Sequence, residues 1–374
     1  MDSYLTKQII TYMGNKRKML PNIQHIIDII ALREGGDHCL TMADGFSGSG
    51  IVSRLMKLNA SKLYTNDISD YSFSLNHCYL SNISETDEQE IRQYIAIANE
   101  HAKNKTVLFS EPFISGNWAP LGDTIQPSDR AYFTKENGNR IDIFRNYIDT
   151  IPEAYKPFLL GPLLVEASIH NNTSGQFSAF YKNGDRGQYG GKQQIDLQRI
   201  EKPIELTMPL TVKNDCEIHI SRGDTNEWIK TIPKVDLVYY DPPYNKHPYS
   251  IYYFMLNVIQ QWDKTQVIPE TNRGQKLDWH RSAFNSFSKA EKEFKELIKN
   301  TKAKYILISY NNGGIIPLDV LENILREFGT VEKFPIEHNT YNRLKGISEY
   351  KRTTEKVKIK EFMWLLTTNF PIID

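Results

Sequence analysis

The feature that most constrains the fold is the alternation of helical and strand patterns in the first third of the chain. Helical patterns span residues 16–32, residues from 51 onward and residues 71–80, with strand patterns between them at 40–43 and 62–65. Such alternation is typical of a parallel sheet whose strands are joined by right-handed crossover helices. We therefore predict an α/β protein with a Rossmann-like, doubly wound sheet.

The same sheet is expected to resume in the second half of the chain. Strand patterns recur at 217–220, 235–240, 305–309, 331–335 and 362–368, with helical patterns at 251–262, 289–300 and 318–327. We assign residues 1–83 and 210–374 to this sheet-bearing domain.

Residues 84–209 have a different character. Helical stretches at 88–102, 141–150 and 154–167 precede the polar run HNNTSGQFSAFYKNGDRGQYGGKQQ. A loop of about 20 residues without structure of its own is usually functional or disordered. We interpret residues 84–209 as an inserted, mainly helical domain that carries a mobile polar loop.

Composition limits the class of protein. The 374 residues carry 45 basic and 45 acidic side chains, a balance that neither predicts nor excludes a nucleic-acid partner. No apolar run approaches the roughly 18 residues of a membrane span, and the N-terminus lacks a cleavable-signal pattern, so we expect a soluble, cytoplasmic protein. Cys39, Cys78 and Cys216 lie far apart, which argues against a disulfide framework and a zinc cluster; we expect no metal.

The stretch TMADGFSGSGIVSRLM places a strand, an acid, a glycine-rich turn and a helix in succession. In a doubly wound sheet such a turn meets a nucleotide-like ligand, and Gly48 and Gly50 are the expected positions of close approach. The third glycine of the dinucleotide fingerprint and the lysine of a P-loop are missing, so pyrophosphate binding is not favoured. A plain strand-to-helix turn is the alternative interpretation.

The next predicted strand also ends in an acid. Asp67 follows it about 20 residues downstream, the spacing at which an acidic side chain in this fold class contacts ribose hydroxyls. Because Asp67 also precedes a predicted helix, capping of that helix is the alternative role.

The run VDLVYYDPPY sets an acid, two prolines and a tyrosine at the tip of an apolar strand. Asp241 offers a carboxylate oxygen, and the rigid Pro242-Pro243 turn offers a carbonyl oxygen, which together suit a planar exocyclic NH2 group. Tyr244 provides a stacking surface for the ring that carries the amine. Two acceptors on the amine hydrogens favour a pyramidal nitrogen whose lone pair attacks a carbon in line, without an enzyme nucleophile or metal. The alternative interpretation is that this run forms only a proline-containing type I turn with no catalytic role.

These motifs carry a resemblance to a known family. The order TYMGNKRKML, ADGFSGSG, TNDIS, an insertion, SRGDTNEW and DPPY resembles the alpha-group, Dam-like, S-adenosylmethionine-dependent N6-adenine DNA methyltransferases of restriction-modification type. HNNTSGQFSAFYK and ISYNNGGIIP also resemble restriction-associated adenine methylases. The resemblance implies S-adenosyl-L-methionine as cofactor, DNA as partner and target recognition by the insertion. The sequence departs from the family pattern at Ser47, Ser49 and the triplet 13–15, and these changes affect only the fine geometry of the site.

The resemblance also implies roles for individual residues. Catalysis falls to Asp241, Pro242, Pro243 and Tyr244. Cofactor contacts fall to Tyr12, Lys16, Asp44, Phe46, Ser47, Gly48, Gly50, Asp67, Asp224 and Asp241. A lone lysine such as Lys16 often lies along a helix surface instead, and Asp224 is also placed to cap a helix beginning near Thr225.

A duplex hides the adenine amino group, so this site requires the target nucleotide to be flipped out of the helix. Basic and aromatic side chains of the insertion loop and the lip after DPPY are predicted to contact DNA: Lys182, Arg186, Tyr189, Lys192, Arg199 and Tyr249. A second basic stretch, residues 343–360, is either a phosphate-tracking hairpin or an exposed β-ribbon. His247 receives no role, because a methylated amine loses its proton to water.

The leading hypothesis is a site-specific adenine N6 methyltransferase, working beside a cognate endonuclease that acts separately. N4-cytosine methylation uses the same acceptor logic, although the cytosine enzymes more often carry serine where Asp241 stands. A catalytically silent DNA-binding regulator is a rival of another class, and the intact set of Asp241, Tyr244 and the glycine turn argues against it. A nicotinamide-dependent dehydrogenase is disfavoured by the incomplete glycine fingerprint.

Overall fold

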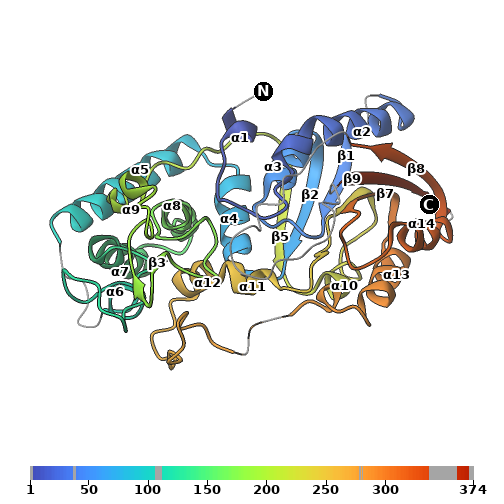
Figure 1. The fold of residues 1–374 in the computed structure, drawn as a ribbon. Helices are drawn as coiled ribbons and strands as arrows, with labels where there is room; N and C mark the ends of the chain where they lie inside the picture. The colour runs from blue at the N-terminus through green and yellow to red at the C-terminus, as the bar shows by residue number, and fades with distance from the viewer. Residues whose placement is uncertain are drawn as a thin grey trace.

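The computed structural model describes residues 3–36, 39–105, 112–277, 279, 281–336 and 360–369. The sheet-bearing part contains the following elements in chain order, before and after the insertion (Figure 1): α1 (Ser3–Thr6), the 3-10 helix η1 (Lys16–Met19), α2 (Leu20–Arg33), β1 (Leu40–Asp44), α3 (Ile51–Lys57), β2 (Ala60–Asp67) and α4 (Asp70–Leu80), then β5 (Glu217–Arg222), α10 (Thr225–Trp228), β6 (Val235–Tyr240), α11 (Tyr249–Tyr252), α12 (Phe254–Gln261), the 3-10 helix η2 (Ala283–Asn285), α13 (Ala290–Asn300), β7 (Ala303–Asn311), α14 (Leu318–Arg326), β8 (Gly329–Pro335) and β9 (Glu361–Thr368).

The large sheet has seven strands in the order β5-β2-β1-β6-β7-β9-β8. Its pairings are parallel except those of β9, which runs antiparallel to both β7 and β8. The predicted α/β class and Rossmann-like sheet are confirmed. The reversed strand β9 is the departure from a purely parallel sheet, and its strand pattern alone does not encode direction.

The central strand β6 is apolar because both faces of the sheet are covered. Leu237 and Tyr239 pack with α1, α2 and α3 on one face, whereas Val238 and Tyr240 pack with α13 and α14 on the other. Figure 1 shows the sheet between these two layers of helices. Full burial of an aliphatic side chain such as Leu237 or Val238 contributes about 1.5–3 kcal/mol, so this strand holds its end firmly.

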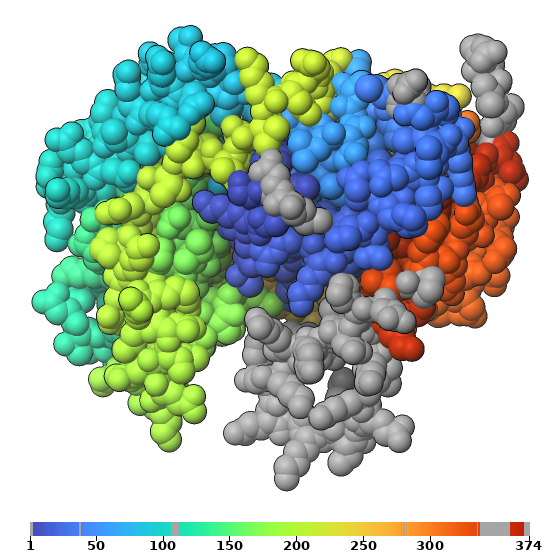
Figure 2. Space-filling view, turned by 90° about the horizontal axis from the view of Figure 1, so that it is seen from above, coloured from blue at the N-terminus to red at the C-terminus, as the bar shows by residue number. Residues whose placement is uncertain are grey.

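The inserted segment is mainly helical. It contains α5 (Glu85–Lys103), α6 (Ile114–Asn117), α7 (Lys135–Thr150), α8 (Lys156–Ile169), the short strands β3 (Lys182–Asn183) and β4 (Arg186–Gly187), and α9 (Leu197–Glu201). Its apolar core continues into α4 and α12 of the sheet-bearing part. Seen from above in Figure 2, the inserted segment, coloured cyan to yellow-green, lies beside the blue and orange-red residues of the sheet-bearing part. The domain boundaries at 84 and 209 stay a prediction.

The polar run after α8 is anchored more firmly than a mobile loop would be. Asn171, Asn172 and Thr173 are fully buried. The Asn172 amide donates to the Ala131 carbonyl at 2.9 Å and accepts from Gly190 N–H at 3.0 Å. Phe177 is buried in the helical core. The first part of the predicted mobile loop is therefore packed, whereas residues 183–186 of the β3-β4 hairpin and residues 192–194 after it are exposed.

One smaller difference concerns a helix. The helix predicted over 251–262 is interrupted at Tyr253, which separates α11 from α12. In the described part of the chain, no helix combines the length and apolar character needed to span a membrane.

Candidate active site

Three carboxylates lie at the carboxyl ends of neighbouring strands. Asp44 ends β1 and Asp67 ends β2, while Asp241 directly follows β6, and these strands are adjacent in the order β2-β1-β6. Burial raises the pKa of Asp44 to about 7, with further contributions from Asp67 and Asp241. Burial likewise raises the pKa values of Asp67 and Asp241. Such a concentration of buried acids favours a cationic ligand.

The glycine-rich turn lies tightly beside these acids. Gly48 and Gly50 adopt positive φ angles of 52° and 74°. A β-carbon on Gly48 would lie 2.8 Å from the ring of Tyr12, and one on Gly50 would overlap the amide of Asn76. The Asn76 amide donates to the Ser47 hydroxyl at 2.7 Å. Glycine is therefore required at both positions by backbone conformation and by space.

Helix capping was the alternative role of two acids, Asp67 at the end of β2 and Asp224 just after β5. Asp67 accepts from Gly48 N–H and from Ser69 N–H, each at 2.8 Å, so it joins two strand ends; the N-cap of α4 is Ser69. Asp224 is exposed and caps α10, accepting from Asn226 N–H at 2.9 Å. The capping role of Asp224 is thus present, and the cofactor contacts of both acids stay predictions.

Asp241 is held by two donors that engage the same carboxylate oxygen. Lys16 Nζ lies 3.1 Å from Oδ1, and the Ser309 hydroxyl donates to Oδ1 at 2.9 Å. Lys16 is buried and also lies 3.6 Å from Glu361 Oε2. Burial raises the pKa of Asp241, and the Lys16 cation and the Ser309 hydrogen bond oppose that increase. Lys16, predicted as a cofactor contact, is thus an ion-pair partner of Asp241 in this structure.

The other acceptors at this strand end remain free of donors from the described residues. Asp241 Oδ2 and the Pro242 carbonyl receive no hydrogen bond from them. The Asp241 side chain is 17% exposed, so its oxygens are not turned fully into the core. Tyr244 lies beside them, with its ring centroid 5.6 Å from Lys16 Nζ. Gly14 abuts its hydroxyl, since a β-carbon there would lie 2.5 Å away.

Aromatic rings line the space between the N-terminal segment and the lip after DPPY. Tyr12 stacks on Tyr249 and Tyr253, with centroid distances of 5.2 and 5.0 Å. Phe46 packs edge-on against Tyr240 and Phe284 on the other side of the glycine turn.

A cavity of about 280 Å³ opens beside this lip. Ile68, which follows Asp67, and Pro243 both line it. The cavity is also lined by Gln275 and Trp279, whose buried Oε1 and Nε1 atoms lack a hydrogen-bond partner. Unpartnered buried polar atoms cost about 1–3 kcal/mol each, so a polar ligand or water in this cavity is favoured.

The predicted DNA-contacting residues are dispersed. Arg186 and Lys192 are exposed, while Lys182 and Tyr189 are half-buried. Arg199 instead braces the insertion, because its guanidinium donates to the Asn171 carbonyl at 2.8 Å and the Thr173 carbonyl at 3.1 Å. Tyr249 belongs to the aromatic stack. The basic residues 343–359 lie outside the described residues.

Three residues of the site escaped the sequence analysis. Tyr239 OH lies 2.7 Å from the Ser309 hydroxyl, which in turn holds Asp241. Glu361, the first residue of β9, shares the Lys16 cation. The run ISYNN contains Ser309, but only the pairing of β7 with β6 brings it to Asp241.

The fold and the strand-end acids together are those of a Rossmann-like methyltransferase. Residues 12–311 match the model of the D12 class N6 adenine-specific DNA methyltransferases. Because the match spans most of the chain, this protein belongs to that family and is an adenine-specific DNA methyltransferase. Membership implies use of S-adenosylmethionine and a DNA substrate, and the N6 description decides against the cytosine alternative.

Individual relatives agree with this assignment. The chain is 29% identical to the type II methyltransferase M.NlaIII of Neisseria lactamica, covering 96% of this chain and 100% of that protein. It is 27% identical to the modification methylase LlaI of Lactococcus lactis subsp. lactis, over 88% of this chain and 50% of that protein. It is 26% identical to the type II methyltransferase M.FokI of Planomicrobium okeanokoites, over 95% of this chain and 52% of that protein. The chain thus spans all of the first relative and about half of the other two.

Proposed function

We propose that this enzyme methylates the N6 amine of an adenine within one specific DNA sequence, and that Asp241 and the Pro242 carbonyl accept the two hydrogens of that amine. The observation that carries the proposal is the asymmetry at Asp241. Oδ1 is held by Lys16 and Ser309, while Oδ2 and the neighbouring carbonyl receive no donor from the described residues. Anchoring one oxygen fixes the direction in which the other accepts.

This acceptor pair explains how a poor nucleophile becomes reactive. The lone pair of an aryl amine is conjugated into its ring, and hydrogen bonds to both N–H groups favour a pyramidal nitrogen with the lone pair exposed. These two hydrogen bonds strengthen as the amine acquires positive charge. They therefore stabilise the transition state more than the bound base. Tyr244 supplies a ring face for the adenine. The proton released afterwards passes to water.

We infer that the cofactor lies over the ends of β1 and β2. S-adenosylmethionine supplies an electrophilic methyl group on a cationic sulfonium. The residues fit that charge and shape. Asp44 and Asp67 are buried and Asp241 is partly buried, at adjoining strand ends, and the turn at Gly48 has no room for a side chain. We assign the cofactor to the predicted set of Tyr12, Asp44, Phe46, Ser47, Gly48, Gly50, Asp67 and Asp224, with Lys16 acting through Asp241.

We further propose that the target adenine is flipped out of a duplex to reach Tyr244, because the acceptors lie at a strand end rather than on a protruding surface. Residues 84–209 would then serve as the target-recognition domain. The relatives' printed names, type II methyltransferase and modification methylase, support a role as the modification enzyme of a restriction-modification system. A cognate endonuclease would act on the same sequence as a separate protein.

Expression in a host without adenine methylation tests the proposal, with modified bases mapped by long-read sequencing. The expected result is a single methylated motif, and scattered or absent methylation would contradict site specificity. Asp241→Ala and the near-isosteric Asp241→Asn should remove the signal while retaining affinity for S-adenosylhomocysteine. Asp319→Ala, on the exposed start of α14, is the matched control and should methylate normally. Methylation by both Asp241 variants would refute the assigned chemistry.

A further inference from the structure

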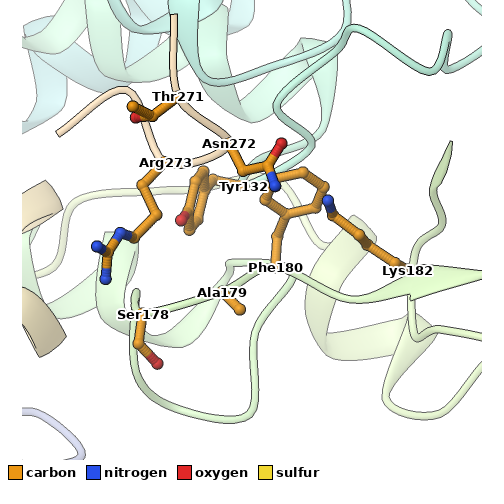
Figure 3. A pocket seen from close by; sticks show the side chains of 8 residues that line it. All are labelled: Tyr132, Ser178, Ala179, Phe180, Lys182, Thr271, Asn272 and Arg273. Atoms are coloured by element: carbon orange, nitrogen blue, oxygen red, sulfur yellow. The ribbon is translucent and has the colours of Figure 1, made fainter. Parts of the chain in front are cut away.

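A second hollow lies between the insertion and the segment that follows α12. Its volume is about 370 Å³. Figure 3 shows it between residues 178–182 of the insertion and residues 271–273 of the later segment. Tyr132 and Phe180 line it as an aromatic floor, with ring centroids 5.0 Å apart. Nothing in the catalytic site described above uses this hollow.

Two cations border the hollow from opposite sides. Lys182 comes from β3, and Arg273 comes from the segment after α12 (Figure 3). Neither forms an ion pair with an acidic side chain among the described residues, whereas the nearby Lys276 lies 3.7 Å from Asp263. Lys182 Nζ lies 4.9 Å from the centroid of the Phe180 ring, which keeps the cation over the floor. Two unpaired cations at one hollow favour an anionic ligand.

The backbone of the later segment is held in place by hydrogen bonds from the insertion. Arg130 donates to the carbonyls of Thr271 at 2.9 Å and Pro269 at 2.7 Å. Trp118 Nε1 donates to the Arg273 carbonyl at 2.9 Å. Both donors belong to the insertion, so the hollow has a fixed width set by contacts between its two sides. Such preorganisation reduces the entropy lost when a ligand binds.

The hollow is also joined to the catalytic lip. Phe177 N–H, next to residues 178–180, donates to the Tyr252 carbonyl of α11 at 2.7 Å. On the other side, Gln275 donates to the Ser250 carbonyl at 2.8 Å. Both walls therefore continue into the helix that follows DPPY. The hollow is therefore connected through α11 to the segment that follows Tyr244.

We propose that this hollow is a DNA subsite, in which Lys182 and Arg273 hold backbone phosphates beside the flipped nucleotide and Asn272 reads the edge of a neighbouring base. The inference rests on the proposed function, since its ligand is the DNA substrate. Asn272 lies between the two cations in Figure 3, and its amide offers both a donor and an acceptor. Phosphate contacts position the DNA, while the amide contributes sequence preference.

The test measures binding of a duplex carrying the mapped motif, by fluorescence anisotropy with S-adenosylhomocysteine present and at several salt concentrations. Arg273→Ala, Arg273→Gln and Lys182→Ala should each weaken binding about tenfold and reduce the slope of log K against log salt by about 0.9. Lys292→Ala, on the exposed surface of α13, is the charge-matched control and should change neither. Unchanged affinity for S-adenosylhomocysteine verifies folding. Affinity within twofold of wild type with an unchanged slope for both Arg273 variants overturns the proposal.

Two further arms separate the alternatives. Asn272→Ala should broaden the methylated motif at one position, and an unaltered motif would remove the base-reading part of the proposal. Inorganic phosphate at millimolar concentration should leave the salt dependence of duplex binding unchanged. If phosphate binds specifically and none of the variants alters duplex binding, the hollow is a small-anion site and the DNA assignment is overturned. Asp241→Asn should lose methylation while the slope of log K against log salt stays unchanged, so failure of the subsite and failure of the proposed chemistry give different results.

Discussion

Replacement of Ser309 by alanine tests how the carboxylate of Asp241, the proposed acceptor of the target amine, is positioned. The substitution removes the 2.9 Å hydrogen bond to Asp241 Oδ1 and leaves Lys16 as the remaining partner of that oxygen. A hydrogen bond to a charged group contributes about 1.5–3 kcal/mol, equivalent to a factor of about 10 to 150 in rate if the bond acts fully in the transition state. Because Lys16 still anchors the carboxylate, we expect the lower part of this range, about 10- to 40-fold.

The assay is single-turnover methyl transfer to a duplex carrying the mapped motif, measured across pH. The Ser309 hydrogen bond lowers the pKa of Asp241 against the effect of burial. Loss of this hydrogen bond therefore raises the pKa of Asp241. Because the ionised carboxylate is the proposed active form, the acidic limb of the pH–rate profile should move to higher pH. The affinity for S-adenosylhomocysteine should change little.

Tyr239→Phe is the control for this experiment. It removes the 2.7 Å contact between Tyr239 OH and Ser309 but keeps the bond from Ser309 to Asp241. We expect a smaller rate loss than for Ser309→Ala and an almost unchanged acidic limb. A Ser309→Ala enzyme that transfers methyl groups within twofold of wild type, with the same pH profile, would refute the positioning role.

Further perturbations address the other parts of the site. Lys16→Met removes the cation that lowers the pKa of the catalytic carboxylate, so the acidic limb of the rate profile should move to higher pH; an unmoved limb contradicts the ion-pair role. Burial raises the pKa of Asp44 to about 7 from an ordinary 3.8. The free energy of unfolding should therefore fall as pH rises from about 4 to about 7, by at most about 4 kcal/mol. Urea denaturation of Asp44→Asn should lack this pH dependence, and the same pH dependence in both proteins would show that the acid is not buried. Gly48→Ala places a β-carbon against the Tyr12 ring at a positive φ and should weaken S-adenosylhomocysteine binding about tenfold in calorimetry, whereas Gly223→Ala, in open space, should bind normally; equal affinities argue against the close approach.

Local sequence patterns predicted the sheet well because strands and their terminal acids are encoded within a few residues. The runs ending at Asp44, Asp67 and Asp241 are each a short strand that ends in an acid or is directly followed by one. Parallel strands bring such ends to one edge, so the grouping of these acids followed from the fold class. The direction of β9 did not follow, because an apolar strand pattern is the same in both directions.

Contacts between distant segments were beyond the reach of local patterns. Lys16 meets Asp241 across more than 200 residues of sequence, and Ser309 reaches it only through the register of β7 on β6. The residues around Arg273 carry no local pattern that marks it as functional, and only the fold brings its segment to the same cavity as Lys182 of β3. The apparently loose polar run was likewise interpreted wrongly, since buried asparagines such as Asn172 satisfy backbone groups and hold a segment in place.

The most direct test is a crystal structure of the enzyme with S-adenosylhomocysteine and a duplex containing the mapped motif. The proposed chemistry predicts the target N6 within about 3.2 Å of both the Asp241 carboxylate and the Pro242 carbonyl, with the base against Tyr244. An extruded adenine whose amine is bound by other groups, with both of these oxygens directed elsewhere, would contradict it.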